Sequence, residues 1–353
     1  MKGPFFTVLI DAYNYGRFIE EAVSSALEQS FPAEDREILV VDDGSTDDTQ
    51  ERLRKFGNSI RYLRKPNGGQ ASAFNLGFEQ ACGKVIALLD ADDVWRPSKL
   101  EKVYKAFQER PDAGMIYHRM HLWNKEDEFS EDSYFIAISG RVPESRQKLL
   151  QYPMVGTSCL SFRREVLKEL LPVPKSLRFQ ADAYLTALVI FLAPVAALPD
   201  FLGRYRLHEA NLFQREKAER WRSQTEQRIA MRRALRLEVG NWLARHGHDV
   251  RCRDIRSYLK QWILSNEKDQ FALEKPGRLK YFRHLLEFPR TYGEIMSPRH
   301  RTYSYLKALA ALFLGYDHLH LLDEARMRWK QWSASSSVAP LPMEKEKAAA
   351  AKS

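Results

Sequence analysis

The chain has few cysteines and little that resembles a membrane span. Its three cysteines, Cys82, Cys159 and Cys252, are scattered along 353 residues with no CxxC pair. They support neither a disulfide framework nor a cysteine zinc site, so we expect a reducing, cytoplasmic compartment. The one apolar stretch to consider, residues 183–198, contains Pro194 and is shorter than the ~20 residues of a membrane helix. We predict a buried helix followed by a strand there.

A secretory signal pattern is also lacking at the N-terminus. The first apolar run is short and ends at Asp11, with no small-residue cleavage site after it, so we interpret it as a first β-strand. Hydrophobic residues make up 44% of the chain and charged residues 29%, which excludes collagen, coiled-coil and wholly disordered proteins. The length suits one large α/β domain with an appendage.

Positive charge is concentrated in the C-terminal part. Residues 1–212 carry 27 Lys and Arg against 30 Asp and Glu, whereas residues 213–353 carry 28 against 16. Such a surplus indicates either a solvated helical face or an acidic partner, such as anionic lipid, a phosphorylated carrier or nucleic acid. The strongly basic segment 215–238 has a helical pattern, and helical segments continue to about Trp332.

The first hundred residues alternate between strand and helix patterns. Short apolar runs typical of strands cover Thr7–Ile10, Glu37–Val41, Ile60–Leu63 and Val85–Leu89. Between them, apolar residues recur with the spacing of amphipathic helices. This alternation needs crossover connections, which predicts a doubly wound, mostly parallel sheet flanked by helices. Ligands of such sheets bind beyond the carboxyl ends of the strands.

Carboxylates follow these strands. In LLDADD, Asp90, Asp92 and Asp93 come directly after an apolar strand. Two such carboxylates can converge on Mg²⁺ or Mn²⁺, whose remaining ligands are commonly waters and phosphate oxygens, which implies a diphosphate ligand. The alternative is that these acids only end the strand and cap the next helix.

Two further motifs occupy turns at the same predicted edge. In VVDDGSTDDT, Asp42 and Asp43 end a buried strand, where a carboxylate can accept a hydrogen bond from a base N–H. The alternative is a turn followed by a helix, capped by Ser45 or Thr46 and starting at Asp47. In PNGGQASAFNLG, an Asn-Gly-Gly turn precedes a helix whose first N–H groups could face an anion.

The order and spacing of these motifs are more specific than any one of them. The sequence resembles glycosyltransferase family 2, the nucleotide-diphosphosugar transferases of the GT-A fold, in TVLIDAYNYGRFIEEAVSSALEQSFP, EILVVDDGSTDDT, PNGGQASAFNLGFEQACGK and VIALLDADDVWRPSKL. The resemblance is dense over residues 5–110 and thinner to about residue 213. It implies transfer of a sugar from a nucleotide-diphosphosugar donor to an acceptor hydroxyl, with inversion and with Mn²⁺ or Mg²⁺.

The resemblance also implies roles for single residues. It makes Asp92 a metal ligand and gives contacts with the nucleotide-sugar to the backbone around Ala12 and Tyr13 and to Asp42, Asp43, Asn75 and Asp90. The chain departs from the family pattern after the first strand, where Asp11 and Ala12 stand in place of Pro and Thr. It departs again at Phe74, where many members have Arg.

Two later segments complete the implied site. An inverting transferase needs a base for the acceptor hydroxyl, and the family's position for it falls on Asp182 in LRFQADAYLTALVIF, whose alternative role is to cap a helix over Tyr184–Leu192. The stretch YRLHEANL resembles the family's Y-R-x-H-x-x-N, which contains Arg206, His208 and Asn211 here. His208 is either a ligand of the metal or diphosphate or a structural residue.

Two other readings are weighed against the transferase. A haloacid-dehalogenase-type phosphatase also has an apolar strand followed by D-x-D-x-V, but its paired acids come after that motif, whereas Asp42 and Asp43 precede it. A non-catalytic sugar-nucleotide-binding protein would use the basic C-terminal helices as its working surface.

The sequence thus predicts three parts. They are a GT-A glycosyltransferase domain at 1–213, a basic helical region at 214–332 and a disordered tail at 333–353. We expect a cytoplasmic enzyme of bacterial surface polysaccharide or glycolipid synthesis, peripheral on the inner face of the plasma membrane. Its expected partners are the donor, a carbohydrate or lipid-linked acceptor and an anionic membrane surface, with no nucleic acid.

Overall fold

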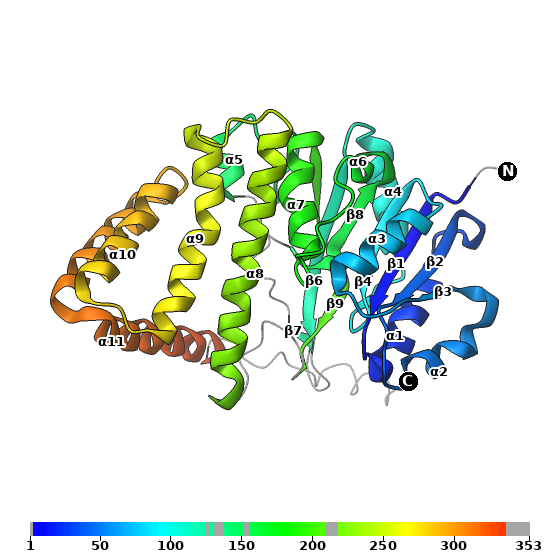
Figure 1. Cartoon of the computed structure of the whole chain (residues 1–353), viewed down its shortest axis with the longest axis horizontal. Coiled ribbons are helices and arrows are strands. Elements are labelled where there is room, and N and C mark those ends of the chain that lie inside the picture. The colour runs from blue at the N-terminus through cyan, green and yellow to red at the C-terminus, as the bar shows by residue number, and fades with distance from the viewer. Residues whose placement is uncertain (1–2, 124–127, 130–136, 152–154, 209–217, 337–353) are drawn as a thin grey trace, which may run out of the picture. The chain divides into compact units, whose positions relative to one another are not determined.

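The structure is a computed structural model that describes residues 3–123, 128–129, 137–151, 155–208 and 218–336. Its strands are β1 (Phe6–Ala12), β2 (Arg36–Asp42), β3 (Arg61–Arg64), β4 (Val85–Asp90), β5 (Val94–Trp95), β6 (Met115–Trp123), β7 (Glu128–Phe129), β8 (Leu160–Arg163) and β9 (Val195–Arg206) (Figure 1).

The helices alternate with these strands and then follow them. They are α1 (Gly16–Leu27), α2 (Thr49–Leu53), α3 (Gln70–Gln80), α4 (Lys99–Glu109), α5 (Arg146–Gln151), α6 (Arg164–Lys168), α7 (Ala181–Leu192), α8 (Ala218–Arg245), α9 (Arg253–Leu273), α10 (Arg278–Tyr292) and α11 (Pro298–Ser336), with 3₁₀ turns η1 (Ala33–Asp35), η2 (Arg54–Ser59) and η3 (Thr157–Cys159).

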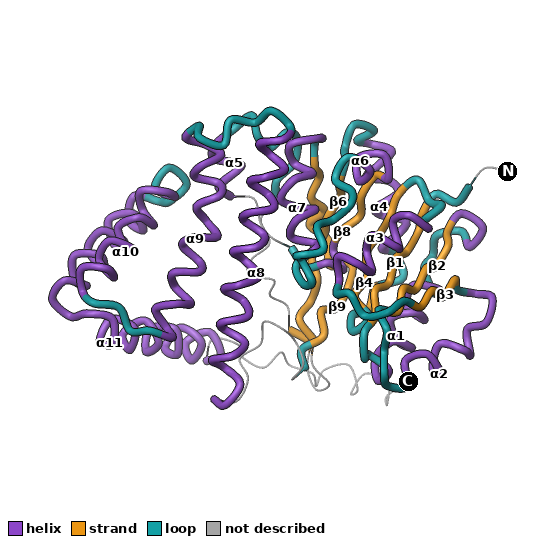
Figure 2. The backbone as a smooth tube through the Cα atoms, viewed as in Figure 1, coloured by secondary structure: helices purple, strands orange, loops and turns teal. Residues whose placement is uncertain are grey.

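The nine described strands form one mixed sheet. Its order is β3-β2-β1-β4-β8-β6-β9-β5, and β7 pairs with β6. The strands β3, β2, β1 and β4 are parallel, whereas β8 runs antiparallel to both β4 and β6. The predicted α/β sheet flanked by helices is confirmed (Figure 2). Its continuous parallel part is β3, β2, β1 and β4, and β6 and β9 form a further parallel pair.

Each face of the sheet buries its own apolar layer. Alternate residues of β1 point to opposite faces, so Val8 and Ile10 pack with α1 and α4, whereas Leu9 packs with α3 and α7. The second layer extends through α8 to α9, where Trp262 is buried. Because both faces are covered, β1, β2 and β4 contain buried, mostly apolar runs that lead to the acids at their carboxyl ends.

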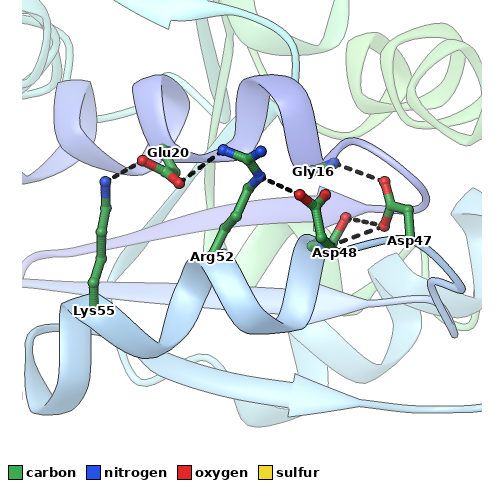
Figure 3. Close-up of polar contacts among 7 residues, drawn as sticks. Gly16, Glu20, Asp47, Asp48, Arg52 and Lys55 are labelled. Atoms are coloured by element: carbon green, nitrogen blue, oxygen red, sulfur yellow. Dashed lines mark hydrogen bonds and ion pairs between the residues drawn. The ribbon is translucent and has the colours of Figure 1, made fainter.

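Helices α1 and α2 are joined by polar contacts (Figure 3). Asp47 Oδ2 accepts a hydrogen bond of 2.9 Å from the Gly16 N–H at the start of α1. Arg52 donates to Asp48 Oδ2 at 2.7 Å and to Glu20 Oε1 at 3.1 Å. Helix α2 therefore begins at Thr49, later than the predicted Asp47, because the Asp47 carboxylate is used to fix α1.

The expected helix and strand over residues 183–198 are present, although the helix starts earlier than predicted. Helix α7 begins at Ala181, so Asp182 lies inside its first turn and is not its N-cap, which is Gln180. None of the described helices is long and apolar enough to cross a membrane.

The chain divides into two compact units, residues 1–270 and 271–353. Helix α8 belongs to the first, since Leu235, Val239 and Trp242 are buried in the same layer as α7. The first unit therefore continues past residue 213, where the transferase domain was expected to end.

The second unit is built on α10 and α11. Phe271, Tyr281, Ala311 and Leu319 form its buried core. Helix α11 changes direction at Gly315, whose φ of 72° is outside the helical range. It ends at Ser336, inside the segment that was predicted to be disordered, and residues 337–353 lie outside the described residues.

Candidate active site

The strand-end acids lie along one edge of the sheet. Because β1 is parallel to both neighbours, register pairs Ala12 with Asp42 of β2 and Asp11 with Asp90 of β4. The strand β1 lies between the other two, so Asp11 stands at the middle of this edge. The carboxyl ends of these strands are where a doubly wound sheet binds its ligands.

Three carboxylates after β4 form a tight cluster. One oxygen from each of Asp90, Asp92 and Asp93 lies within 4.8 Å of the others. Burial, followed by the charges of Asp11 and Asp92, raises the pKa of Asp90 well above its ordinary value. Burial and the Asp92 charge likewise raise the pKa of Asp93. The cluster therefore brings three carboxylates close together in a largely buried site.

Asp93 has a different environment from Asp90. Its Oδ2 accepts a hydrogen bond of 2.6 Å from Ser158, and its Oδ1 accepts one of 2.9 Å from the Arg206 N–H. Arg206 also donates to the Asp92 carbonyl at 2.8 Å. Asp93 thus anchors the turn after β4 to η3 and β9.

His208, which the sequence offered either as a ligand of the metal or diphosphate or as a structural residue, lies against Asp92. Its Nε2 is 2.8 Å from Asp92 Oδ2, and its Nδ1 is 3.3 Å from Arg17 Nη2. Because a guanidinium group only donates hydrogen bonds, Nδ1 accepts and Nε2 carries the proton. In this arrangement His208 donates to Asp92, and direct ligation of a metal through Nε2 needs the other tautomer. Asn211 lies outside the described residues.

Asp42 and Asp43 are held by the protein itself. Asp42 accepts hydrogen bonds from the Ser45 N–H at 2.7 Å and the Tyr62 hydroxyl at 2.6 Å. Asp43 accepts from the N–H groups of Gly68 and Gly69, at 2.9 and 2.6 Å, and pairs with Lys65. Asp43 therefore fixes the Asn-Gly-Gly turn.

That turn is docked on the loop before α7. The Gln70 N–H donates to the Arg178 carbonyl at 2.8 Å, and Gln70 Oε1 accepts from the Ala181 N–H at 2.9 Å. A Cβ on Gly69, whose φ is +85°, would lie 2.6 Å from the Arg178 carbonyl oxygen. The close approach explains a glycine here, and it connects Asp43 to the start of α7.

Both amide atoms of Asn75, which the resemblance implied as a contact of the nucleotide-sugar, are bonded to the backbone of Val173. Its Nδ2 donates to the Val173 carbonyl at 2.9 Å, and its Oδ1 accepts from the Val173 N–H at 2.8 Å. The structure gives Asn75 the role of a clamp between α3 and the loop before α7.

Asp182 lies in the first turn of α7, beside η3. The Thr157 hydroxyl donates to its Oδ2 at 3.1 Å. Burial raises the pKa of Asp182 above its ordinary value of 3.8. Its charge in turn raises the pKa of Asp11 and Asp90, so the predicted base lies close to the strand-end carboxylates.

Asp11 was noted in the sequence only as a departure from the family pattern. Burial, with the charges of Asp182, Asp92 and Asp43, raises its pKa to about 7. Its Oδ1 is buried without a hydrogen-bond partner among the described residues. A signal for it was present, because an apolar run that ends in Asp occurs at β1, β2 and β4 alike.

Ala12 and Tyr13 begin the loop at the middle of this edge. Ala12 is buried and its carbonyl accepts from the Asp43 N–H at 2.8 Å, whereas the Tyr13 side chain is 44% exposed. The next residue, Asn14, has a φ of 59° and accepts from the Thr46 N–H at 2.7 Å. The loop therefore presents an exposed aromatic ring.

The carboxylate set fits a hard divalent cation. Oxygen ligands alone suit Mg²⁺ and Mn²⁺. The raised pKa of Asp90 and the unpartnered oxygen of Asp11 are both signs of negative charge that a cation would neutralise. The described carboxylates suit Mg²⁺ and Mn²⁺ equally.

Comparisons with known proteins match this chain to glycosyltransferases by sequence and by fold. The family model described as glycosyl transferase family 2 matches residues 7–171. An uncharacterized glycosyltransferase of Nostoc sp. is 34% identical over 218 residues, which are 58% of this chain and 65% of that protein. The chondroitin synthase of Pasteurella multocida is 37% identical over 150 residues, 41% of this chain and only 15% of the synthase. The chain thus spans less than two thirds of these relatives.

Solved structures support the fold at lower identity. TarS 1-349 of S. aureus, in complex with UDP-GlcNAc, has a TM-score of 0.59 at 18% identity, over 89% of this chain and 90% of that one. A mannosyltransferase of Pyrobaculum calidifontis, in complex with GDP-Man and Mn²⁺, has a TM-score of 0.51 at 19% identity, over 88% and 86%. Residues 7–171 thus match glycosyl transferase family 2, and the fold of the chain is that of the GT-A glycosyltransferases.

Proposed function

We propose that this chain is a metal-dependent, inverting glycosyltransferase that uses a nucleotide-diphosphosugar. The observation that carries the proposal is that Asp90, which clusters with Asp92, lies close enough to Asp182 for the Asp182 charge to raise its pKa. A metal-binding pair beside a separate buried carboxylate is what a single displacement needs, since one group faces the leaving diphosphate and the other the acceptor.

Asp90 and Asp92 would hold Mn²⁺ or Mg²⁺, and the ion would supply positive charge that stabilises the leaving nucleoside diphosphate. His208 keeps the Asp92 carboxylate in a fixed orientation through their 2.8 Å hydrogen bond. Tyr13 offers an exposed ring on which a nucleobase can stack, beside the backbone of Ala12. The similar structures, which are complexes with UDP-GlcNAc or with GDP-Man and Mn²⁺, support a nucleotide-sugar donor.

Asp182 acts as the base in this proposal. Its carboxylate accepts the proton of the acceptor hydroxyl while that oxygen forms a bond to the anomeric carbon and the bond to the diphosphate oxygen breaks. Because attack comes from the face opposite the leaving group, the configuration inverts. Burial raises the pKa of Asp182 and makes it a stronger base than an exposed carboxylate.

The acceptor is proposed to be a carbohydrate or a lipid-linked saccharide. The partial similarity to the chondroitin and hyaluronan synthases of Pasteurella multocida supports a polysaccharide or glycolipid product. The same proposal includes a cytoplasmic location on an anionic membrane surface. Cosedimentation with anionic vesicles tests the attraction to such a surface.

A turnover assay separates the transferase from the alternatives. The full chain is incubated with UDP- and GDP-sugars, with Mn²⁺ or with a chelator, and release of nucleoside diphosphate is measured with and without oligosaccharide acceptors. The transferase releases nucleoside diphosphate only with metal and faster with an acceptor. A phosphatase would instead release inorganic phosphate from phosphomonoesters, and a non-catalytic protein would bind the donor without turnover.

A further inference from the structure

The 3₁₀ turn η3 lies between the two halves of the candidate site. Its second residue, Ser158, accepts a hydrogen bond of 3.0 Å from the Asp90 N–H and donates one of 2.6 Å to Asp93 Oδ2. The two contacts lie on either side of Asp92. A single hydroxyl, used as acceptor and donor, therefore holds the turn that carries the metal-binding pair.

Ser158 is itself fixed in place. The residue is 1% exposed, and its carbonyl accepts a hydrogen bond of 2.9 Å from Trp95 Nε1. The Trp95 ring, in β5, is buried with Lys99 Nζ 3.2 Å from its centroid. The hydroxyl and the carbonyl of Ser158 are therefore both bonded, and they join η3 to the segment from Asp90 to Trp95.

The preceding residue contacts the base. Thr157 is 3% exposed, and its hydroxyl donates to Asp182 Oδ2 at 3.1 Å. Adjacent residues of one buried turn therefore touch the two parts of the site, although Asp90 and Asp182 are far apart in the sequence. A shift of this turn would move both parts together.

We propose that Thr157 and Ser158 are a pair of positioning residues that fixes Asp182 relative to the Asp90 and Asp92 carboxylates. The inference rests on the proposed function. A single displacement needs the base and the leaving group on opposite sides of one carbon, and a misplacement of ~1 Å can lower the rate by ~100-fold. Neither hydroxyl takes part in the chemistry. Ser158 acts on the metal side, and Thr157 acts on the base.

The test uses variants that separate these two effects. Ser158→Ala and Ser158→Cys remove or weaken the bonds to the turn after β4. Thr157→Val removes the bond to Asp182 at nearly constant shape, and Thr157→Ser keeps it. The matched control is Ser161→Ala, because the Ser161 hydroxyl is equally buried and has no hydrogen-bond partner among the described residues.

Two quantities are measured for each variant, together with a thermal melt. The first is the affinity for Mn²⁺ alone, from the electron paramagnetic resonance signal of free Mn²⁺. The second is kcat for release of nucleoside diphosphate from a UDP- or GDP-sugar that the wild type turns over. We expect Ser158→Ala to weaken Mn²⁺ binding by about 10–100-fold, as is usual for residues behind metal ligands, and Ser158→Cys to weaken it less.

Thr157→Val is expected to keep Mn²⁺ affinity within about twofold and to lose about 10–100-fold in kcat, which Thr157→Ser restores. Ser161→Ala should match the wild type. The proposal is overturned if folded Ser158→Ala or Ser158→Cys binds Mn²⁺ as the wild type does. It is also overturned if Thr157→Val keeps full kcat. A wild type that binds no Mn²⁺ and releases no nucleoside diphosphate contradicts the proposed function itself.

Discussion

His208 Nε2 and Asp92 Oδ2 lie 2.8 Å apart, and the hydrogen bond between them joins the segment after β9 to the turn after β4. Both side chains are buried. Because both partners belong to the protein, the bond fixes the orientation of the Asp92 carboxylate before a donor binds.

The first prediction is that Asp92→Ala abolishes turnover and metal-dependent donor affinity while the fold persists. Asp92 follows a buried strand and contributes its carboxylate to the cluster with Asp90 and Asp93, so its loss affects the cation more than the core. Calorimetric titration of UDP- and GDP-sugars with and without Mn²⁺ measures the change, and circular dichroism checks the fold.

His208→Gln is the companion variant, because it removes the contact with Asp92 and keeps the carboxylate. We expect it to weaken metal-dependent donor binding by about 10–100-fold, less than Asp92→Ala. Wild-type turnover in Asp92→Ala, or full wild-type activity after complete chelation, would contradict the metal assignment.

A second prediction separates binding from chemistry. Asp182→Asn keeps the shape of the side chain but cannot accept the acceptor proton, so transfer should fall by roughly 10²–10⁴ with normal donor affinity. Steady-state kinetics and donor titration on the same preparation measure both quantities. Equal losses of donor affinity and turnover would instead indicate a structural or metal-binding role.

The pH profile provides the control for Asp182. Because burial raises its pKa above the ordinary 3.8, the carboxyl becomes protonated, and so loses its ability to act as a base, at a higher pH than an exposed aspartate. Wild-type kcat should therefore decline as pH falls through this raised value. The residual activity of Asp182→Asn should not show this decline.

The sequence predicts the placement of the strand-end acids well, because its signals are local. An apolar run that ends in Asp gives both the strand and the acid, and the parallel register of β1 and β4 then brings Asp11 beside Asp90. The family resemblance predicts Asp182 as the base. In the structure burial raises the pKa of Asp182, and its charge acts on Asp90 at the same edge of the sheet.

The sequence does not show which polar groups already have hydrogen-bond partners within the protein. Asn75 carries no local sign that both of its amide atoms bind Val173, 98 residues away. Thr157 and Ser158 lie in the irregular part of the chain, where neither periodicity nor a motif marks them, and their partners are set by the packing of η3 against β4 and α7. Contacts of this kind depend on tertiary structure.

The third prediction concerns Asn75. Replacing it with Ala leaves the buried Val173 N–H and carbonyl without their partners, so the free energy of unfolding should fall by about 2 kcal/mol or more. Urea unfolding measures this loss, with exposed Asn58→Ala as the control. Donor affinity should stay within about threefold at temperatures where the variant is folded. A large loss of affinity at unchanged stability would restore the donor contact that the family resemblance implies.

The fourth prediction concerns the basic C-terminal region, where the structure distinguishes paired from exposed arginines of α8. Arg228 and Arg232 of α8 form ion pairs with Asp269 of α9, whereas Arg233 and Arg236 are exposed. Of these four arginines, the exposed pair is therefore the better placed to contact an anionic membrane. Cosedimentation with anionic vesicles at low salt should fall in the Arg233→Glu, Arg236→Glu double variant and should weaken with added salt.

The control for this experiment reverses two exposed arginines elsewhere, Arg54 and Arg110, and so changes the net charge equally. Equal loss in both double variants would show attraction by net charge alone. Equal cosedimentation of the wild type with anionic and neutral vesicles would end the membrane-surface proposal and favour a water-soluble acceptor.

The most direct test of the account is the anomeric configuration of the transferred sugar. The proposed function has one buried base, Asp182, and a separate metal site at the acid cluster for the diphosphate, which implies a single displacement. With a donor of known configuration and an acceptor found by turnover, the proton NMR coupling constant of the new glycosidic bond gives the stereochemistry. We predict the inverted anomer as the initial product, and the retained anomer would contradict the account.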